Sequence, residues 1–142
     1  MIKIKLSISL FFILVIAGVN IAQKADDIIG KYRLPNKLDI EIFKENGKYS
    51  GKIIALHNYN QGQTTDIHNS DENKHNEPLI VMQIINKLQF DRKENNWING
   101  SMYGPEKGLT FNLKVTEVKE HEIVVIGSKY FFWKTLVWER IL

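Results

Sequence analysis

Apolar and polar residues alternate along several short segments of this chain, at the period expected for strands with one buried face. In "LDIEIF" (38–43), Leu38, Ile40 and Ile42 share one face, while Asp39 and Glu41 lie on the other. The turn-like "KENG" and the segment "KYSGKIIAL" follow directly. This order predicts a β-hairpin.

The second half of the chain repeats this organisation. "WINGSMY" (97–103), the turn "GPEKG" and the alternating "LTFNLKVTEV" (109–118) predict a second hairpin, and "EIVVIG" and "TLVWERI" follow as further strands. The apolar run "LIVMQIINKLQF" (79–90) does not reveal its period. Its Ile and Val content favours a strand over a helix.

These segments predict an all-β fold with about eight short strands and no helix. We expect a single small antiparallel meander β-barrel, because closure removes the exposed edges of a sheet; an open β-sandwich is the alternative. Two sites favour closure: Gly30 and Tyr32 open the first strand, and Arg140 lies on the last. They resemble the calycin signature, in which an arginine packs over an aromatic ring, although Tyr32 replaces the usual tryptophan.

The amino terminus resembles an export signal. Two lysines in "MIKIK" precede a mostly apolar run over residues 6–19, which is shorter than the about 20 residues of a membrane span. We predict a signal peptide over residues 1–22, cleaved after Ala22, with Ala25 as the second choice and an uncleaved anchor as the alternative. The remaining residues 23–142 then form one domain of an exported, periplasmic or secreted protein without an integral membrane span.

Composition narrows the function classes. Removal of residues 1–22 takes away Lys3 and Lys5, so the formal charge falls from +3 to +1. A net charge this small gives no electrostatic footprint for nucleic acid or for an anionic membrane. The chain contains no cysteine, which excludes zinc–thiolate sites, redox motifs and a cysteine nucleophile. We predict no metal and no cofactor, and the oligomeric state is left open.

A wider resemblance covers the whole predicted mature chain. "DDIIG", "GKYSGKI", "TDIHNSD", "MYGPEKGLTF" and "TLVWER" are similar to motifs of the exported bacterial family called domain of unknown function 2147 (DUF2147). Several polar family positions differ, since Ser70 replaces proline, Glu77 replaces arginine and Gly104 replaces aspartate. The resemblance implies a small barrel of lipocalin-like character and supplies no established activity.

The polar segment 57–77 raises the question of a metal or catalytic site. Asp66, Asn69 and Asp71 occupy the family's loop positions and supply oxygen atoms suited to a hard cation. A transition-metal site in this segment would need the side chains of His57, His68 and His75 to converge. Because Asp and Asn also bind their own backbone and start turns, we interpret the cluster as mainly architectural.

Two further features bear on function. "YFFW" (Tyr130, Phe131, Phe132 and Trp133) cannot all face one core if it is extended, so two of these side chains should be exposed, or the segment is a loop tip. Its interpretation is either a lip at the barrel mouth that contacts a lipid, an envelope surface or a partner, or local packing under a hairpin. The candidate lining of an interior pocket is Tyr49, Met102, Tyr103, Phe111 and Trp138. We therefore favour a binding protein for a small apolar or lipid-like ligand or an envelope component. The alternatives are an envelope hydrolase that uses loop carboxylates, and a surface-contact module.

Overall fold

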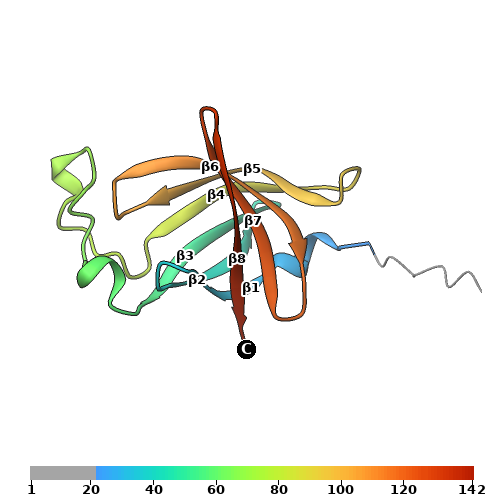
Figure 1. Cartoon of the computed structure of the whole chain (residues 1–142), viewed down its shortest axis with the longest axis horizontal. Helices are drawn as coiled ribbons and strands as arrows, with labels where there is room; N and C mark the ends of the chain where they lie inside the picture. Colours follow the sequence, from blue (N-terminus) through green and yellow to red (C-terminus); the bar gives the residue numbers. More distant parts are fainter. Residues whose placement is uncertain (1–21) are drawn as a thin grey trace, which may run out of the picture.

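The chain forms a closed antiparallel β-barrel with three short 3₁₀-helices (Figure 1). The computed structural model describes residues 22–142, so the expected signal sequence lies outside the described residues except for Ala22. Within this range, none of the helices has the length and apolar character needed to cross a membrane. The elements in chain order are η1 (Ala25–Ile28), β1 (Gly30–Arg33), β2 (Leu38–Glu45), β3 (Lys48–Leu56), η2 (Tyr59–Gln61), η3 (Glu72–Lys74), β4 (Gln83–Asp91), β5 (Asn96–Gly104), β6 (Leu109–Val118), β7 (Glu122–Lys129) and β8 (Phe132–Ile141).

Each strand pairs with the next, and β8 returns to pair with β1. The predicted all-β meander barrel is therefore confirmed, and the sandwich alternative is wrong. Alternation sets the core as expected, because Leu38, Ile40 and Ile42 of β2 are fully buried. They join one apolar cluster with side chains from all the other strands.

The apolar run at residues 79–90 is a strand only in its second part, which corrects the sequence-based expectation. β4 begins at Gln83, and Val81 adopts a left-handed backbone conformation with φ of 64°. The Met82 amide donates to the Leu79 carbonyl, and the Val81 amide donates to the Ile53 carbonyl of β3. These bonds form a turn that brings the preceding loop back to the barrel.

The seam between β1 and β8 carries the residues predicted for closure. Tyr32 pairs with Arg140, whose guanidinium lies 5.4 Å from the centroid of the Tyr32 ring. Arg140 Nη2 also donates to the Tyr32 hydroxyl at 2.8 Å and to the Asp27 carbonyl at 2.7 Å. Burial raises the pKa of Tyr32, against the effect of the Arg140 hydrogen bond. Gly30 begins β1 beside this pair.

The segment containing η1 covers one end of the barrel. Ile28 is fully buried, and the Ile28 carbonyl accepts the Tyr32 hydroxyl at 2.7 Å. The indole of Trp97 donates to the Ala25 carbonyl at 2.9 Å, and the Tyr49 hydroxyl donates to Asp26 at 2.5 Å. Burial, followed by the Asp26 hydrogen bond, raises the pKa of Tyr49. Side chains from three strands therefore hold η1 over this end, which we call the plugged end.

The long loop between β3 and β4 lies at the opposite end, which we call the open end (Figure 1). It contacts the β5–β6 turn closely at Gly108. Gly108 has φ of 66°, and a Cβ atom added there would lie 1.9 Å from the His68 carbonyl oxygen. Only glycine fits this contact without displacing backbone, because both the conformation and the space exclude a side chain.

Replacing Arg140 tests the seam. We expect Arg140→Met to lower the free energy of unfolding by about 2–4 kcal/mol, because it removes the cation–π contact and the hydrogen bonds to the Tyr32 hydroxyl and the Asp27 carbonyl. Arg92→Met in the exposed β4–β5 turn is the matched control, expected to change stability by less than about 0.5 kcal/mol. Urea unfolding followed by tryptophan fluorescence measures both variants, and equal losses would contradict the assigned role.

Replacing Gly108 tests the loop contact. We expect Gly108→Ala to destabilise the protein by about 2 kcal/mol or more and to speed amide hydrogen exchange in residues 57–82, because the methyl group displaces the His68 carbonyl. Gly47→Ala is the control, since Gly47 also has positive φ (75°) but has no atom within 4 Å of an added Cβ. It should lose only about 1 kcal/mol, without faster exchange in the loop. Identical behaviour of the two variants would refute the contact.

Candidate functional site

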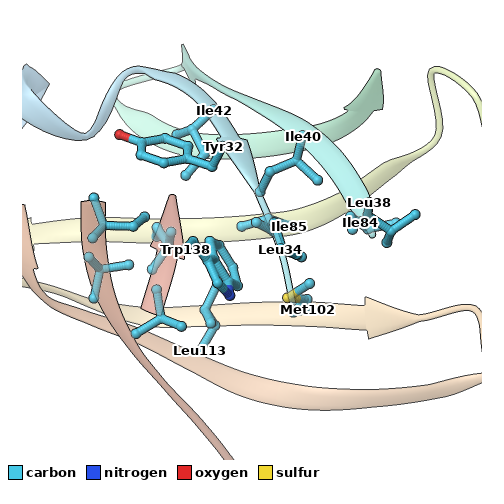
Figure 2. Packing of buried hydrophobic residues seen from close by; sticks show 14 of the residues in the cluster. Tyr32, Leu34, Leu38, Ile40, Ile42, Ile84, Ile85, Met102, Leu113 and Trp138 are labelled. Carbon is cyan, nitrogen blue, oxygen red and sulfur yellow. The ribbon is translucent and has the colours of Figure 1, made fainter. Parts of the chain in front are cut away.

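The open end of the barrel holds a cup with a volume of about 260 Å³. Its floor is made by Trp138 of β8 with Met102 and Leu113, which lie close together in Figure 2. These three side chains are at most 5% exposed, so the barrel is filled below them and hollow above. The apolar wall is completed by Leu34, Leu38, Phe111, Val125 and Leu136.

The wall depends on a close approach between β6 and β7. The ring of Phe111 lies so near Gly127 that an added Cβ would be 3.2 Å from it. Because Gly127 has no side chain, the Phe111 ring lies against the β7 backbone, where both residues line the cup. A larger residue at Gly127 would push this ring away and change the shape of the cup.

Polar atoms in the lining come mostly from turns, with the exception of Lys134 on β8. Asn36 lies in the β1–β2 turn, Glu106 in the β5–β6 turn, and all three side chains line the cup. The Glu106 carboxylate accepts a hydrogen bond from the Tyr59 hydroxyl of η2. Burial and this bond raise the pKa of Tyr59. The cup therefore combines an apolar interior with one anionic and one cationic side chain.

The structure brings together four of the five residues predicted as pocket lining. Met102, Tyr103, Phe111 and Trp138 line the cup, whereas Tyr49 does not. Tyr49 corrects the expectation, because it lies near the start of β3 and donates to Asp26 at the plugged end. Its side chain points inward as predicted, but at the wrong depth for the cup.

Sequence reasoning missed several lining residues that strand parity identifies. Leu136 stands two positions before Trp138 on β8, and Val125 stands two positions before Gly127 on β7. Residues two apart on a strand share a face, so either could have been found from its neighbour. Leu34 and Pro35 follow β1 in a turn, where no periodic signal marks them.

The polar cluster of the loop holds the loop to the barrel. Asp66 is only 2% exposed, and its two carboxylate oxygens accept the Tyr103 hydroxyl at 2.6 Å and the Asn69 amide at 2.8 Å. Burial, followed by the Asp66 hydrogen bond, raises the pKa of Tyr103. Asp71 accepts from the Asn73 amide at 3.0 Å and so caps η3. These contacts fit the architectural interpretation of the cluster.

The histidines of the loop have separate partners. His57 Nε2 lies 2.7 Å from Asp39, and His75 Nε2 lies 2.6 Å from the Asn69 carbonyl. His68 contributes its carbonyl to the Gly108 contact. Across the described residues 22–142, no group of three or more His, Cys, Asp or Glu side chains is placed to hold a metal ion.

An ion cluster outside the cup was not predicted. Asp39 is buried although it lies opposite the apolar face of β2, because Arg33 donates to both of its oxygens at 2.8 and 2.9 Å. The Arg33 hydrogen bond, with that of His57, holds the pKa of Asp39 below its ordinary value. A wide depression of about 590 Å³ beside this cluster is also lined by Lys37 and Glu139. Because Asp39 of β2 pairs with Arg33 of β1 and with His57, we interpret the cluster as a structural contact between β1 and β2 at the barrel surface.

The aromatic segment forms the β7–β8 turn at the open end. Tyr130, Phe131, Phe132 and Trp133 are between 75% and 92% exposed. The turn projects beyond the rest of the barrel in Figure 1. Sequence alternation predicted that two of these side chains would be exposed or that the segment would be a loop tip; it is the tip, with all four exposed.

Comparisons with known proteins place the fold. No curated protein matches the chain. Among solved structures, the barrel is similar to Helicobacter pylori protein HP1028, described as belonging to the lipocalin family, with a TM-score of 0.70 and 19% identity over 80% of this chain and 82% of that chain. This likeness shows a shared lipocalin-like fold.

The sequence motifs that resemble DUF2147 are borne out by a match to the family model. The match runs from the first residue of β1 to the closure residue Arg140, and so includes the whole barrel except the last residue of β8. Residues 30–140 match the model described as "Uncharacterized protein conserved in bacteria (DUF2147)", and the chain belongs to this family.

Proposed function

We propose that this protein is an exported binding protein that holds a small apolar or lipid-like ligand in the cup at the open end. The observation that carries the proposal is the cup itself, an apolar cavity of about 260 Å³ in the mouth of a closed barrel. Apolar cavities with a few polar groups at the edge are the usual form of small-molecule sites.

The size of the cup restricts the ligand. Pockets for drug-sized molecules measure about 300–1,000 Å³, so this cup suits a small molecule or one end of a longer chain. Trp138, Met102 and Leu113 close the floor, so an apolar end would contact them. A polar end would remain near Lys134 and Glu106, where a charged group keeps access to water.

Export rests on the amino-terminal sequence. The two lysines and the apolar run over residues 6–19 have the form of a signal peptide, and the chain has no cysteine for a lipid anchor. Contacts of the first described residues favour cleavage after Ala22 over Ala25. The Gln23 side chain donates to the Asn95 carbonyl at 2.7 Å and accepts from the Val118 amide. Cleavage after Ala25 would remove these bonds and the carbonyl that Trp97 uses.

A pair of substitutions on neighbouring positions of β8 tests the cup. Leu136→Trp places a large ring in the cup, whereas Val137→Trp places the same ring on the outside, where Val137 is 45% exposed. We expect Leu136→Trp to weaken binding of the apolar dye N-phenyl-1-naphthylamine at least about tenfold, and Val137→Trp to leave it unchanged.

Fluorescence titration of the dye measures both variants, and circular dichroism checks that both remain folded. Native mass spectrometry of mildly purified wild-type protein should also show a retained small apolar mass that Leu136→Trp loses. If the wild type does not bind the dye, or both variants bind it equally, the cup is not the binding site.

The position of cleavage gives a separate prediction. Protein recovered from the exported fraction should begin at Gln23 and contain residues 23–142, as measured by amino-terminal sequencing and intact mass. A mature chain that begins at Asp26 would contradict the proposed role of Gln23, and an uncleaved chain would contradict the signal peptide.

A further inference from the structure

We propose that the β7–β8 tip, defined as residues 129–134, inserts into the interfacial region of an anionic lipid membrane and holds the mouth of the cup at that surface. The tip consists of Tyr130, Phe131, Phe132 and Trp133 between Lys129 and Lys134. The inference deepens the proposed function, because it names the source from which a lipid-like ligand would reach the cup, and its apolar contact is tested separately from the cup.

Exposure makes the tip unusual among the apolar residues of the chain. Four consecutive aromatic side chains are 75–92% exposed, whereas the other two tryptophans, Trp97 and Trp138, are at most 2% exposed. Single exposed apolar residues are common on protein surfaces, but a contiguous patch indicates contact with something apolar. Nothing in the described part of the barrel covers these rings.

Geometry favours a lipid phase over a protein partner. The last β6–β7 pair is Asn112 with Ser128, and the last β1–β8 pair is Arg33 with Glu139, so the ribbon beyond them has no neighbouring strand. Side chains along an extended ribbon alternate between its two faces, and consecutive aromatics therefore occupy both. A folded partner would cover one face, whereas a fluid membrane interface surrounds the whole ribbon.

The chemistry of the tip matches a membrane interface. Tryptophan and tyrosine concentrate where lipid headgroups meet the hydrocarbon, and lysines extend their amines towards the headgroups. The chain carries Lys129 and Lys134 and no Asp or Glu between Ile123 and Trp138. Lys129 Nζ lies 5.4 Å from the centroid of the Tyr130 ring, which keeps the cation beside the aromatic cluster. This charge favours anionic lipids.

The backbone at the turn carries a bulky residue in a conformation that suits a small one. Lys129 pairs with Phe132, so Tyr130 and Phe131 form a two-residue turn, and Tyr130 has φ of 55°. Glycine or asparagine would take this conformation at lower cost. Tyrosine at this position adds apolar surface where turn chemistry alone would favour a small residue.

A groove connects the tip to the cup. The groove has a volume of about 330 Å³ and is lined by Phe132, Trp133 and Leu109. It shares Phe111, Gly127, Lys134 and Leu136 with the cup. A lipid-like molecule leaving a membrane at the tip would therefore remain against apolar side chains until it reached the floor.

Vesicle binding of the full-length mature protein tests this inference, with phosphatidylglycerol-containing vesicles compared with phosphatidylcholine vesicles. Cosedimentation should show binding to the anionic vesicles that weakens with added salt. The emission of Trp133 should shift to shorter wavelength on binding, and quenching by acrylamide should fall. Because Trp97 and Trp138 are buried, these changes report on the tip.

Variants separate the tip from the rest of the open end. Phe131→Ser should lower partitioning about tenfold, because it removes the most exposed ring of the tip, and Phe131→Leu should restore most of it. Val81→Ser, which removes another exposed apolar side chain at the open end, should change nothing. Lys129→Gln with Lys134→Gln should remove the preference for anionic vesicles, whereas Lys48→Gln with Lys93→Gln at the plugged end should preserve it.

The outcomes distinguish this inference from the cup. Leu136→Trp should bind vesicles like the wild type, and Phe131→Ser should bind the apolar dye like the wild type. Equal partitioning of wild type and Phe131→Ser, or an unchanged Trp133 emission, would overturn the inference even if the cup binds the dye. A wild-type dimer in sedimentation velocity that becomes a monomer in Phe131→Ser, without vesicle binding, would assign the tip to a second copy instead.

Discussion

Closure of the barrel depends on the contact between Arg140 and Tyr32. β1 has only four residues and pairs with β8 at three positions, so backbone bonds alone give this seam little strength. The guanidinium adds a cation–π contact and two hydrogen bonds that join β8, β1 and η1. Without the seam, the eight strands would be an open sheet with two exposed edges and no interior. The plugged end, the open end and the cup all follow from this one closure.

Closure of a meander also decides which segments become neighbours. Because consecutive strands run in opposite directions, the turns after β1, β3, β5 and β7 all lie at the open end. The long loop, the Glu106 turn and the aromatic tip are far apart in sequence, yet they surround one mouth. The other turns and η1 lie at the plugged end. Segments that are separate motifs in the sequence are therefore parts of one rim.

The sequence predicts well which side chains face the interior, but it predicts poorly how far along the barrel axis each of them lies. Period-two alternation places Leu38, Met102 and Trp138 inside, and the structure agrees. Tyr49 also faces inward, but it is the second residue of β3 and follows the β2–β3 turn, so it lies near the plugged end. The sequence does not show which end of the barrel holds the cup. The start of β4 was placed too early because Val81 adopts a left-handed conformation, which a β-branched residue rarely takes and which the sequence therefore does not predict. The sequence left open a catalytic or metal-binding role for Asp66, because its partner Tyr103 is 37 residues away and becomes a neighbour only in the folded barrel.

β8 connects the features that matter most for function. It carries Trp133 at the tip, Leu136 and Trp138 in the cup, and Arg140 at the seam. Trp133 and Trp138 are five positions apart on one extended strand, so the tip and the floor are separated by about 17 Å. This distance is comparable to the thickness of one layer of acyl chains, since the hydrocarbon core of a bilayer is about 30 Å thick. Apolar side chains line the path between the two points. Pairing with β7 over residues 132–139 keeps β8 extended, and Arg140 joins its far end to β1. The seam therefore does more than close the barrel, because it anchors the strand that carries both the cup floor and the aromatic tip.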